Sequence, residues 1–564
     1  MFVMKGLVLG FVVLLFCGQG FSQGEISRNG LINVKEYKAL GDGITDDTQA
    51  IQSCISRANE GDTVFIPEGK YLVKALGLKS GVHIRAEGVL VQNLAGERED
   101  FSTSKQNSSA PLFRGINVSN IYLSFNTRTI HEAIYLSGSK NIQINNSQIR
   151  GDSKTFKSFA GILLYDCEDV SITNSTISEY GAGRESADIY QPGTAIRILS
   201  SKNVSVTHNQ IVNNGENGVF MHDTPDVEVS HNTILNNGMS AIQVAFGSNG
   251  IEKNYEFINN LMESNAADAI DINNRSTRKF MDINCHIEKN MSRNNGFVKG
   301  VSTPDGSGIA TLINVSGVTM VNNIADRNNR PALYIESCGT IIATGNKADN
   351  QVEVVLDFDE LLLTDNSFST INLLSNVDGN KLHLTNNKLI SLSLPNGIKV
   401  DSLIMEKNLI SNAKLNFNME GNVRMIGNTL NSHQNDGALL VVRVNSMHLE
   451  KNLITSSKSH AVAIRKMANQ VTIVNNDIKS VNSCIIDDGS KGLVIKGNKL
   501  MSLEGGSFYH TLISRNPDGL ILSGNEHISS EGNTSLLLEG NGTAWISNEK
   551  IPEGFADYGS VEVK

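Results

Sequence analysis

The sequence repeats one short unit many times, and this repetition restricts the fold more than any other feature. Residues 202–223 (KNVSVTHNQIVNNGENGVFMHD) hold three short segments of alternating apolar and polar residues, separated by an Asn turn and a Gly turn. Residues 225–245 (PDVEVSHNTILNNGMSAIQVA) repeat the arrangement closely. A period of two is typical of β-strands. Each unit is therefore predicted to form three short strands.

One Asn position recurs through most of the chain, at intervals of 20 to 34 residues. The series is Asn209, Asn232, Asn260, Asn290, Asn323, Asn346, Asn366, Asn387, Asn408, Asn428, Asn452, Asn476, Asn498, Asn525 and Asn548, with Ser147 and Ser175 in two earlier units. A unit this short cannot bury an apolar face alone, so the units must stack. The pattern predicts an all-β parallel solenoid in which Asn side chains hydrogen-bond from turn to turn.

The first residues have the pattern of a secretory signal peptide. Lys5 precedes an apolar run from Leu7 to Cys17, and small residues follow at Gly20 and Ser22. The run is too short to span a membrane. We expect residues 1–22 to be removed and the protein to be secreted or periplasmic. The bulky Phe16 before Cys17 argues against lipoprotein anchoring.

The remaining cysteines and the charge exclude several classes of protein. Five cysteines remain after residue 22, far apart and in no CxxC or Cys/His cluster, so we expect small buried thiols rather than disulfides or zinc ligands. The net charge of −10 argues against nucleic-acid binding. We expect a monomer whose partner is a substrate.

Residues 30–73 do not follow the repeat. A helix is predicted to begin near Thr45, with Asp46 and Asp47 at its positive end. Its apolar stripe is Ile51, Cys54, Ile55 and Ala58. A helix that precedes a solenoid is most simply a cap over the first open edge.

Three segments resemble the opening of the pectate lyase superfamily: GDGITDDTQAIQSCI (41–55), TVFIPEGKYLV (63–73) and LKSGVHI (78–84). That group includes polygalacturonase-like hydrolases, polysaccharide lyases and phage tailspikes. The resemblance implies a right-handed, single-stranded parallel β-helix with an N-terminal capping α-helix, and assigns Asp46 and Asp47 to the cap rather than to catalysis. The predicted division is a cap at 23–90, a β-helix at 91–548 and a C-terminal tail at 549–564.

Long insertions are concentrated in the middle of the repeat, at 178–307. They are expected as loops at 178–192, 246–254, 273–282 and 291–307. Insertions in a solenoid collect on its binding side. The plain alternative is tolerated variation in loop length, but the shorter units between Asn346 and Asn476 favour a site in the middle.

The strand after each Gly turn is predicted to carry the chemistry. Its third and fifth residues should face solvent and form two columns along the solenoid. The third positions are Tyr135, Leu163, Arg197, Phe220, Gln243, Asp271, Ala310 and Tyr334; the fifth are Ser137, Tyr165, Leu199, His222, Ala245, Asn273, Leu312 and Glu336. We expect an extended polymer to bind there, through Tyr135, Tyr165, Phe220, Gln243, Asn273 and Arg275.

Two reactions fit these residues. β-Elimination on a uronic-acid polymer needs a cation for the sugar carboxylate and a base for the adjacent proton, for which Arg197 and His222 are the candidates. As in pectate lyases, Arg197 could itself be the base. Hydrolysis needs two carboxylates, for which Asp223, Asp268 and Asp271 are the candidates. Elimination is favoured, epimerisation shares its first step, and a non-catalytic glycan-binding or adhesin solenoid is the alternative outside enzymes.

The chain departs from the family in its catalytic motifs. The NTD, DD, GHG and RIK set of polygalacturonases and the Asp-Pro-His motif of mannuronan epimerases are missing. The clustered calcium carboxylates of pectate lyases are not evident either. No cofactor is predicted, and a divalent cation such as calcium stays open, as does the identity of any metal ligand.

Overall fold

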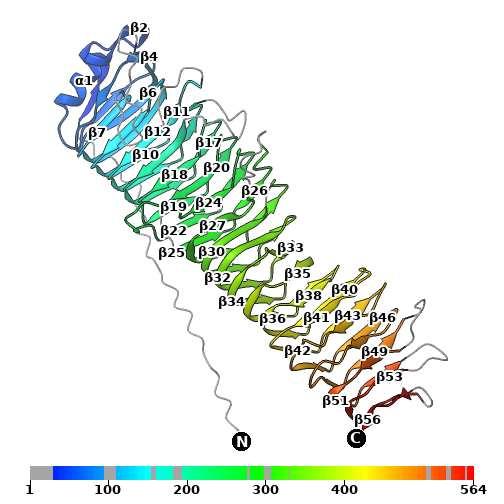
Figure 1. Ribbon diagram of the computed structural model, residues 1–564. Helices are drawn as coiled ribbons and strands as arrows, with labels where there is room; N and C mark the ends of the chain where they lie inside the picture. The colour runs from blue at the N-terminus through cyan, green and yellow to red at the C-terminus, as the bar shows by residue number, and fades with distance from the viewer. Residues whose placement is uncertain are drawn as a thin grey trace, which may run out of the picture.

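The computed structural model describes residues 30–94, 110–153, 160–181, 193–275, 280–297, 307–329, 331–503, 510–528, 535–552 and 556–564. The predicted signal peptide, including Cys17, lies outside them, as do parts of the loops expected at 178–192, 273–282 and 291–307. The described chain winds into a parallel β-solenoid of about 19 turns, which forms a long rod (Figure 1). The predicted all-β solenoid is confirmed.

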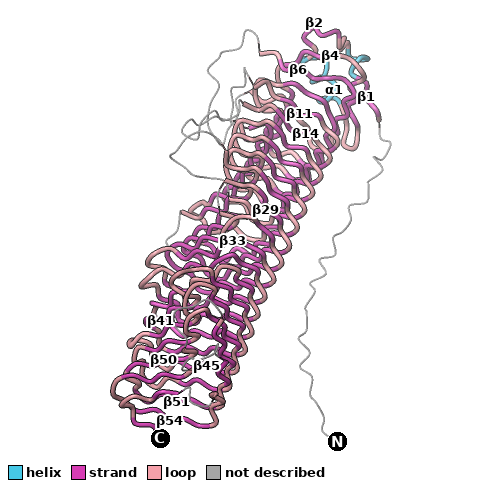
Figure 2. Tube along the Cα trace, turned by 90° about the vertical axis from the view of Figure 1, so that its right-hand side faces the viewer, coloured by secondary structure: helices cyan, strands magenta, loops and turns pink. Residues whose placement is uncertain are grey.

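Each central turn contributes three strands. One turn holds β16 (Lys202–Thr207), β17 (Gln210–Val212) and β18 (Val219–His222). The next holds β19 (Val227–Ser230), β20 (Thr233–Leu235) and β21 (Ile242–Ala245). Each strand pairs in parallel with its counterpart one turn on, so three columns of strands run along the rod (Figure 2). Alternate residues such as Val219 and Met221 point inward and form one continuous apolar core.

The third column positions the predicted site. Its strands are β9 (Ile134–Ser137), β12 (Ala160–Tyr165), β15 (Thr194–Leu199), β18, β21, β24 (Ile270–Asn273), β27 (Ala310–Ile313) and β30 (Leu333–Thr344). Further along the rod, a separate seven-stranded sheet takes over this face. It consists of β38 (Leu415–Asn418), β41 (Leu439–Arg443), β44 (Val462–Ile464), β47 (Ile485–Asp487), β50 (Leu512–Arg515), β53 (Leu536–Glu539) and β55 (Ala556–Asp557).

A single α-helix occurs among the described residues, and it lies at the N-terminal end of the rod (Figure 1). Helix α1 spans Thr48–Arg57, so it begins three residues after the predicted Thr45. Its stripe of Ile51, Cys54 and Ile55 is buried, as predicted. The Asp47 carboxylate accepts hydrogen bonds from the backbone N–H groups of Leu40 (2.7 Å) and Gly41 (3.0 Å). This carboxylate therefore fixes the chain that enters the helix.

The predicted Asn ladder is present. The backbone N–H and side-chain Nδ2 of Asn209 both donate to Oδ1 of Asn232, at 2.9 and 3.1 Å, and this arrangement repeats down to Asn525. Ser147 and Ser175 continue it at the other end. Asn548 was predicted to be the last member, and this prediction is wrong. The backbone N–H and Nδ2 of Asn525 donate to Oε1 of Glu549 instead.

A second ladder runs parallel to the first and was not predicted. It joins Asn214, Asn237, Asn265, Asn295 and Asn328, with side-chain hydrogen bonds of 2.9 to 3.1 Å between successive members. Each member lies five residues after a member of the first ladder. That fixed offset is a signal the sequence does carry.

The five cysteines of the described chain are free and buried, as predicted. Within the same residues, no helix has the length and apolar character needed to cross a membrane.

Candidate functional site

Two columns of outward-facing residues lie on the third strand column, in the predicted register. Phe220, Gln243 and Asp271 are paired in one column, and His222, Ala245 and Asn273 in the other. The prediction is wrong by one residue at β27. There Thr311 and Ile313 occupy the columns, while Ala310 and Leu312 point into the core. Ile309, not Gly308, occupies the position that Ala241 and Ala269 hold directly before the preceding strands.

The N-terminal part of the columns is not exposed. Tyr135, Leu163 and Leu199 are buried with Ala160 in an apolar cluster outside the main core, and Tyr165 and Phe220 pack against it half-buried. Tyr135 is only 4% exposed, so the prediction that it faces solvent is wrong. Tyr165 and Phe220 keep a partly open ring for that role.

The Arg197 side chain is also buried rather than exposed on the surface. It is 2% exposed, and its Nη2 donates to Oε2 of Glu216 at 2.7 Å and to Oγ1 of Thr194 at 3.1 Å. Its guanidinium lies 4.5 Å from the centre of the Phe220 ring. A guanidinium that is buried and ion-paired does not offer its charge to a sugar carboxylate. The prediction that Arg197 is exposed is therefore wrong.

A chain of amide hydrogen bonds fixes Gln243. Nδ2 of Asn217 donates to Oε1 of Gln243 at 2.9 Å, and Nε2 of Gln243 donates to Oδ2 of Asp271 at 2.8 Å. Asp271 is 7% exposed. It was predicted to face solvent as a catalytic carboxylate; instead it holds the Gln243 amide in one orientation.

Asp268 lies beside the same strand and is 6% exposed. Its Oδ1 accepts hydrogen bonds from the backbone N–H of Ser307 (2.6 Å) and from Oγ1 of Thr311 (3.1 Å). Thr311 is also the strand neighbour of Asp271. The predicted carboxylates Asp268 and Asp271 are thus brought close to one another, but they are buried and engaged by the protein.

The accessible part of the two columns centres on Ala245. His222 precedes it by one turn and Asn273 follows it by one turn. The His222 side chain is 38% exposed, and its Nδ1 lies 3.6 Å from Oδ2 of Asp223. Oδ1 of Asn273 is buried and accepts no hydrogen bond from the described chain. The small, partly exposed Ala245 side chain lies between these two polar side chains in the column.

Further along the rod, Arg275 is exposed just after β24. The hydroxyl of Tyr334 donates to Oε2 of Glu336 at 2.7 Å. Burial raises the pKa of the Tyr334 phenol, the bond to Glu336 raises it further, and the charge of Arg275 lowers it. The positive Arg275 therefore lies near the phenol, beyond Asn273.

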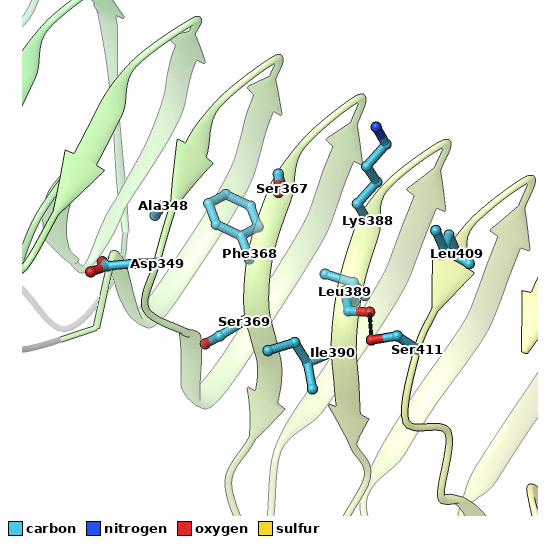
Figure 3. Close-up of a pocket in the computed structure, with 10 residues that line it drawn as sticks. All are labelled: Ala348, Asp349, Ser367, Phe368, Ser369, Lys388, Leu389, Ile390, Leu409 and Ser411. Carbon is cyan, nitrogen blue, oxygen red and sulfur yellow. Dashed lines mark hydrogen bonds between the residues drawn. The ribbon is translucent and has the colours of Figure 1, made fainter. Parts of the chain in front are cut away.

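The structure also has two hollows away from His222, Ala245 and Asn273. One, of about 440 Å³, borders the turns that follow β9, β12 and β15 and extends to Pro225 and Ile251; there Lys140 and Lys202 flank Glu168 at 3.9 and 2.9 Å. The other, of about 290 Å³, lies on the second strand column, between β31 (Lys347–Ala348) and β37 (Leu409–Ile410) (Figure 3). Lys388 and Asp349 are its only charged lining residues, so we place the site at Ala245 rather than here.

Sequence reasoning missed Glu216, Asn217, Ser307 and Thr311. Glu216 and Asn217 occupy the Gly turn of their unit, and nothing in the sequence marks that turn as the partner of Arg197 and Gln243. Throughout the described chain, no three His, Cys, Asp or Glu residues are grouped as metal ligands.

Residues 31–260 match the family model "Rhamnogalacturonase A/epimerase, pectate lyase-like". The predicted resemblance to the pectate lyase group is confirmed. The matched region includes the cap and the turns up to β22 (Tyr255–Ile258), and therefore His222, Ala245 and the apolar cluster. Pectate lyase-like proteins of this kind include epimerases, lyases and polygalacturonases, and the match does not separate these reactions.

Curated relatives match over short stretches. Mannuronan C5-epimerase AlgE1 of Azotobacter vinelandii is 45% identical over 67 residues, which is 10% of this chain and 5% of the relative. Plasmin and fibronectin-binding protein A of Streptococcus pneumoniae is 51% identical over 57 residues, 9% of this chain and 8% of the relative. The chain thus spans under a tenth of the length of either relative.

A family 28 exopolygalacturonase from Yersinia enterocolitica is among the similar solved structures. It is 15% identical, with a TM-score of 0.41, over 65% of this chain and 79% of its own.

Proposed function

We propose that the protein is a secreted enzyme that cleaves a uronic-acid-containing polysaccharide by β-elimination, with His222 as the base. One observation carries the proposal: His222 is a half-exposed imidazole whose neighbour in the column is the small Ala245, in the part of the chain that matches the family. Secretion rests on the N-terminal sequence alone. An imidazole can both accept and release a proton, which suits it to general base catalysis.

The proposed reaction begins when His222 removes the proton from the sugar carbon next to the carboxylate. The electron pair left on that carbon forms a double bond to the neighbouring carbon, and the glycosidic carbon–oxygen bond breaks. The leaving oxygen then takes up a proton. Asp223 lies 3.6 Å from Nδ1 of His222, so it favours the tautomer whose other nitrogen accepts a proton, and it stabilises the imidazolium formed.

The sugar carboxylate must be partly neutralised before its neighbouring proton becomes acidic. In the proposal Arg275 takes this role in place of Arg197, because Arg275 is exposed. Asn273 and the fixed amide of Gln243 add polar contacts on the two columns. Tyr165 and Phe220 offer partly open aromatic rings to sugars on the preceding turns. Successive turns lie about 4.8 Å apart, which suits an extended polymer.

Hydrolysis by Asp223, Asp268 and Asp271 is the less favoured reaction. Two of these carboxylates are almost completely buried and accept hydrogen bonds from the protein. A paired general acid and base must instead reach the glycosidic oxygen and a water molecule. The alternative of a non-catalytic glycan-binding or adhesin solenoid is supported by one observation, the short match to a plasmin and fibronectin-binding protein.

The test compares His222→Gln with His208→Gln. His208 lies in the same turn of the solenoid but on another column, where its ring stacks on His231 at 4.8 Å. The proteins are incubated with a panel of uronic-acid polysaccharides, and the ultraviolet absorbance of the new conjugated double bond is followed. We expect His222→Gln to lose roughly a hundredfold or more of the rate and His208→Gln to keep it. Equal rates in both variants would refute the role of His222.

A further inference from the structure

Two carboxylates lie in the turns beside His222, and both lie close to the same glycine. Asp223 directly follows β18 in the left-handed region, with φ of 50°. Glu252 lies near the end of the 246–254 loop that follows β21, and it is 1% exposed. This glycine is Gly247. Its backbone N–H donates to Oε1 of Glu252 at 2.7 Å, and a Cβ added to it would overlap Oδ1 of Asp223 at 1.8 Å.

Each carboxylate has a buried oxygen that the protein leaves unsatisfied. Oδ1 of Asp223 and Oε2 of Glu252 have no hydrogen-bond partner among the described residues. The described ion pairs include none to Glu252. Oδ2 of Asp223 lies 3.6 Å from Nδ1 of His222 and accepts a hydrogen bond from Nδ2 of Asn249 at 3.3 Å, so its contacts are at the other oxygen. An ionised carboxylate without compensation is costly to bury. Two such groups in one place call for a positive charge that the described side chains do not provide.

A buried tyrosine joins the two turns that carry these carboxylates. Tyr255 lies in β22, three residues after Glu252, and its hydroxyl donates to the backbone oxygen of Thr224 at 2.6 Å. Thr224 directly follows Asp223, so this bond holds the two turns against one another.

We propose that Asp223 and Glu252 bind one divalent cation of the calcium type. Calcium takes about six to eight oxygen ligands and accepts backbone carbonyls and water alongside carboxylates, so carbonyl groups and water would complete the site around the two acidic side chains. The cation would tie the 246–254 loop to the turn after β18. It would occupy Oδ1 of Asp223 and leave Oδ2 facing His222. This inference concerns binding, and it stands whether or not the protein is a lyase.

The test uses the full chain, freed of metal by a chelator and titrated with calcium chloride. Calorimetry should show one binding event per chain, and the melting temperature should rise with calcium. Glu252→Gln should abolish both effects. Asp226→Asn is the matched control, because it removes an exposed carboxylate from the same turn, bonded to Asn254 at 2.7 Å, and it should bind like the wild type.

A melting transition measured in the presence of chelator will show whether Glu252→Gln is folded. Without metal, Glu252→Gln removes a buried uncompensated charge, so it should melt at or above the wild-type temperature. With calcium, the wild type should melt higher. Absence of heat and of a melting shift in the wild type would overturn the proposal. Undiminished binding by Glu252→Gln or by an Asp223→Asn/Glu252→Gln double variant would also overturn it, since the cation would then lie elsewhere.

Discussion

The guanidinium of Arg197 donates a 2.7 Å hydrogen bond to the carboxylate of Glu216 on the next turn of the solenoid, and both side chains are buried. Thr194 donates to the same carboxylate. This buried pair joins β15 to the turn before β18, directly beneath Phe220. Arg197 is thus a structural cation beside the site.

Removal of one member of this pair should destabilise the protein. Arg197→Met leaves Glu216 as a buried, uncompensated charge, and breaking such a pair costs roughly 3–5 kcal/mol. We expect a clear fall in the melting temperature. The double variant Arg197→Met/Glu216→Leu should recover much of it, because neither charge then remains. A catalytic Arg197 would instead give a stable, inactive single variant.

The Asn ladder should contribute to stability at each of its members. Oδ1 of Asn366 accepts the backbone N–H (2.9 Å) and Nδ2 (3.0 Å) of Asn346, and its own Nδ2 donates to Asn387. Asn366→Ala leaves these buried groups unpaired, and we expect a loss of roughly 2–4 kcal/mol in urea unfolding. Asn372→Ala, on the outer face of β33 (Ser367–Leu373), is the control and should change stability little. Equal losses of stability in the two variants would show that a ladder Asn contributes no more than an Asn on the outer face.

The fold was predictable because its physical causes are local and repeated. Alternation with period two, an Asn at each turn and the absence of a helical pattern specify stacked strands. The capping helix was also predictable from Ile51, Cys54 and Ile55. The error at Asn548 arose because the last turn replaces Asn with the chemically different Glu549.

The candidate site was predictable only as a position on the rod. Alternation shows that Arg197 and Asp271 point outward from their strands, but it cannot show what covers the outer face. Burial there depends on Glu216, Asn217 and the apolar residues around Leu163, which come together only in three dimensions. The shift at Thr311 has a different cause: the glycine of this unit lies one residue earlier relative to its strand, and a register error of one residue changes which side chains face outward.

The cysteines should resist modification in the folded protein. Burial raises the pKa of the Cys54 thiol to about 11 and that of Cys338 to about 12. Since the thiolate is the reactive form, little of either thiol is reactive at pH 8. We expect negligible reaction with a thiol reagent until a denaturant unfolds the chain, when the signal should appear in full. Rapid labelling of the native protein would contradict the packing described.

The buried Asp487 should lower the free energy of unfolding at neutral pH. Burial raises the pKa of its carboxyl group, although Ser490 and Ser514 donate hydrogen bonds to it and lower the pKa. Because the folded state holds this proton more tightly than the unfolded state, the free energy of unfolding falls as pH rises through the folded-state pKa. Asp487→Asn should therefore gain stability relative to the wild type from acid to neutral pH. If the difference in melting temperature between Asp487→Asn and the wild type stayed constant across that pH range, this prediction would be contradicted.

The most direct test of the proposed reaction is the mass of the products released from a uronic-acid polysaccharide. Elimination creates an unsaturated sugar at the new non-reducing end, so we predict fragments lighter by one water than those from hydrolysis. They should be absent with His222→Gln. Fragments of the hydrated mass would contradict the account and favour hydrolysis by the Asp residues. Binding without any fragment would leave a glycan-binding solenoid.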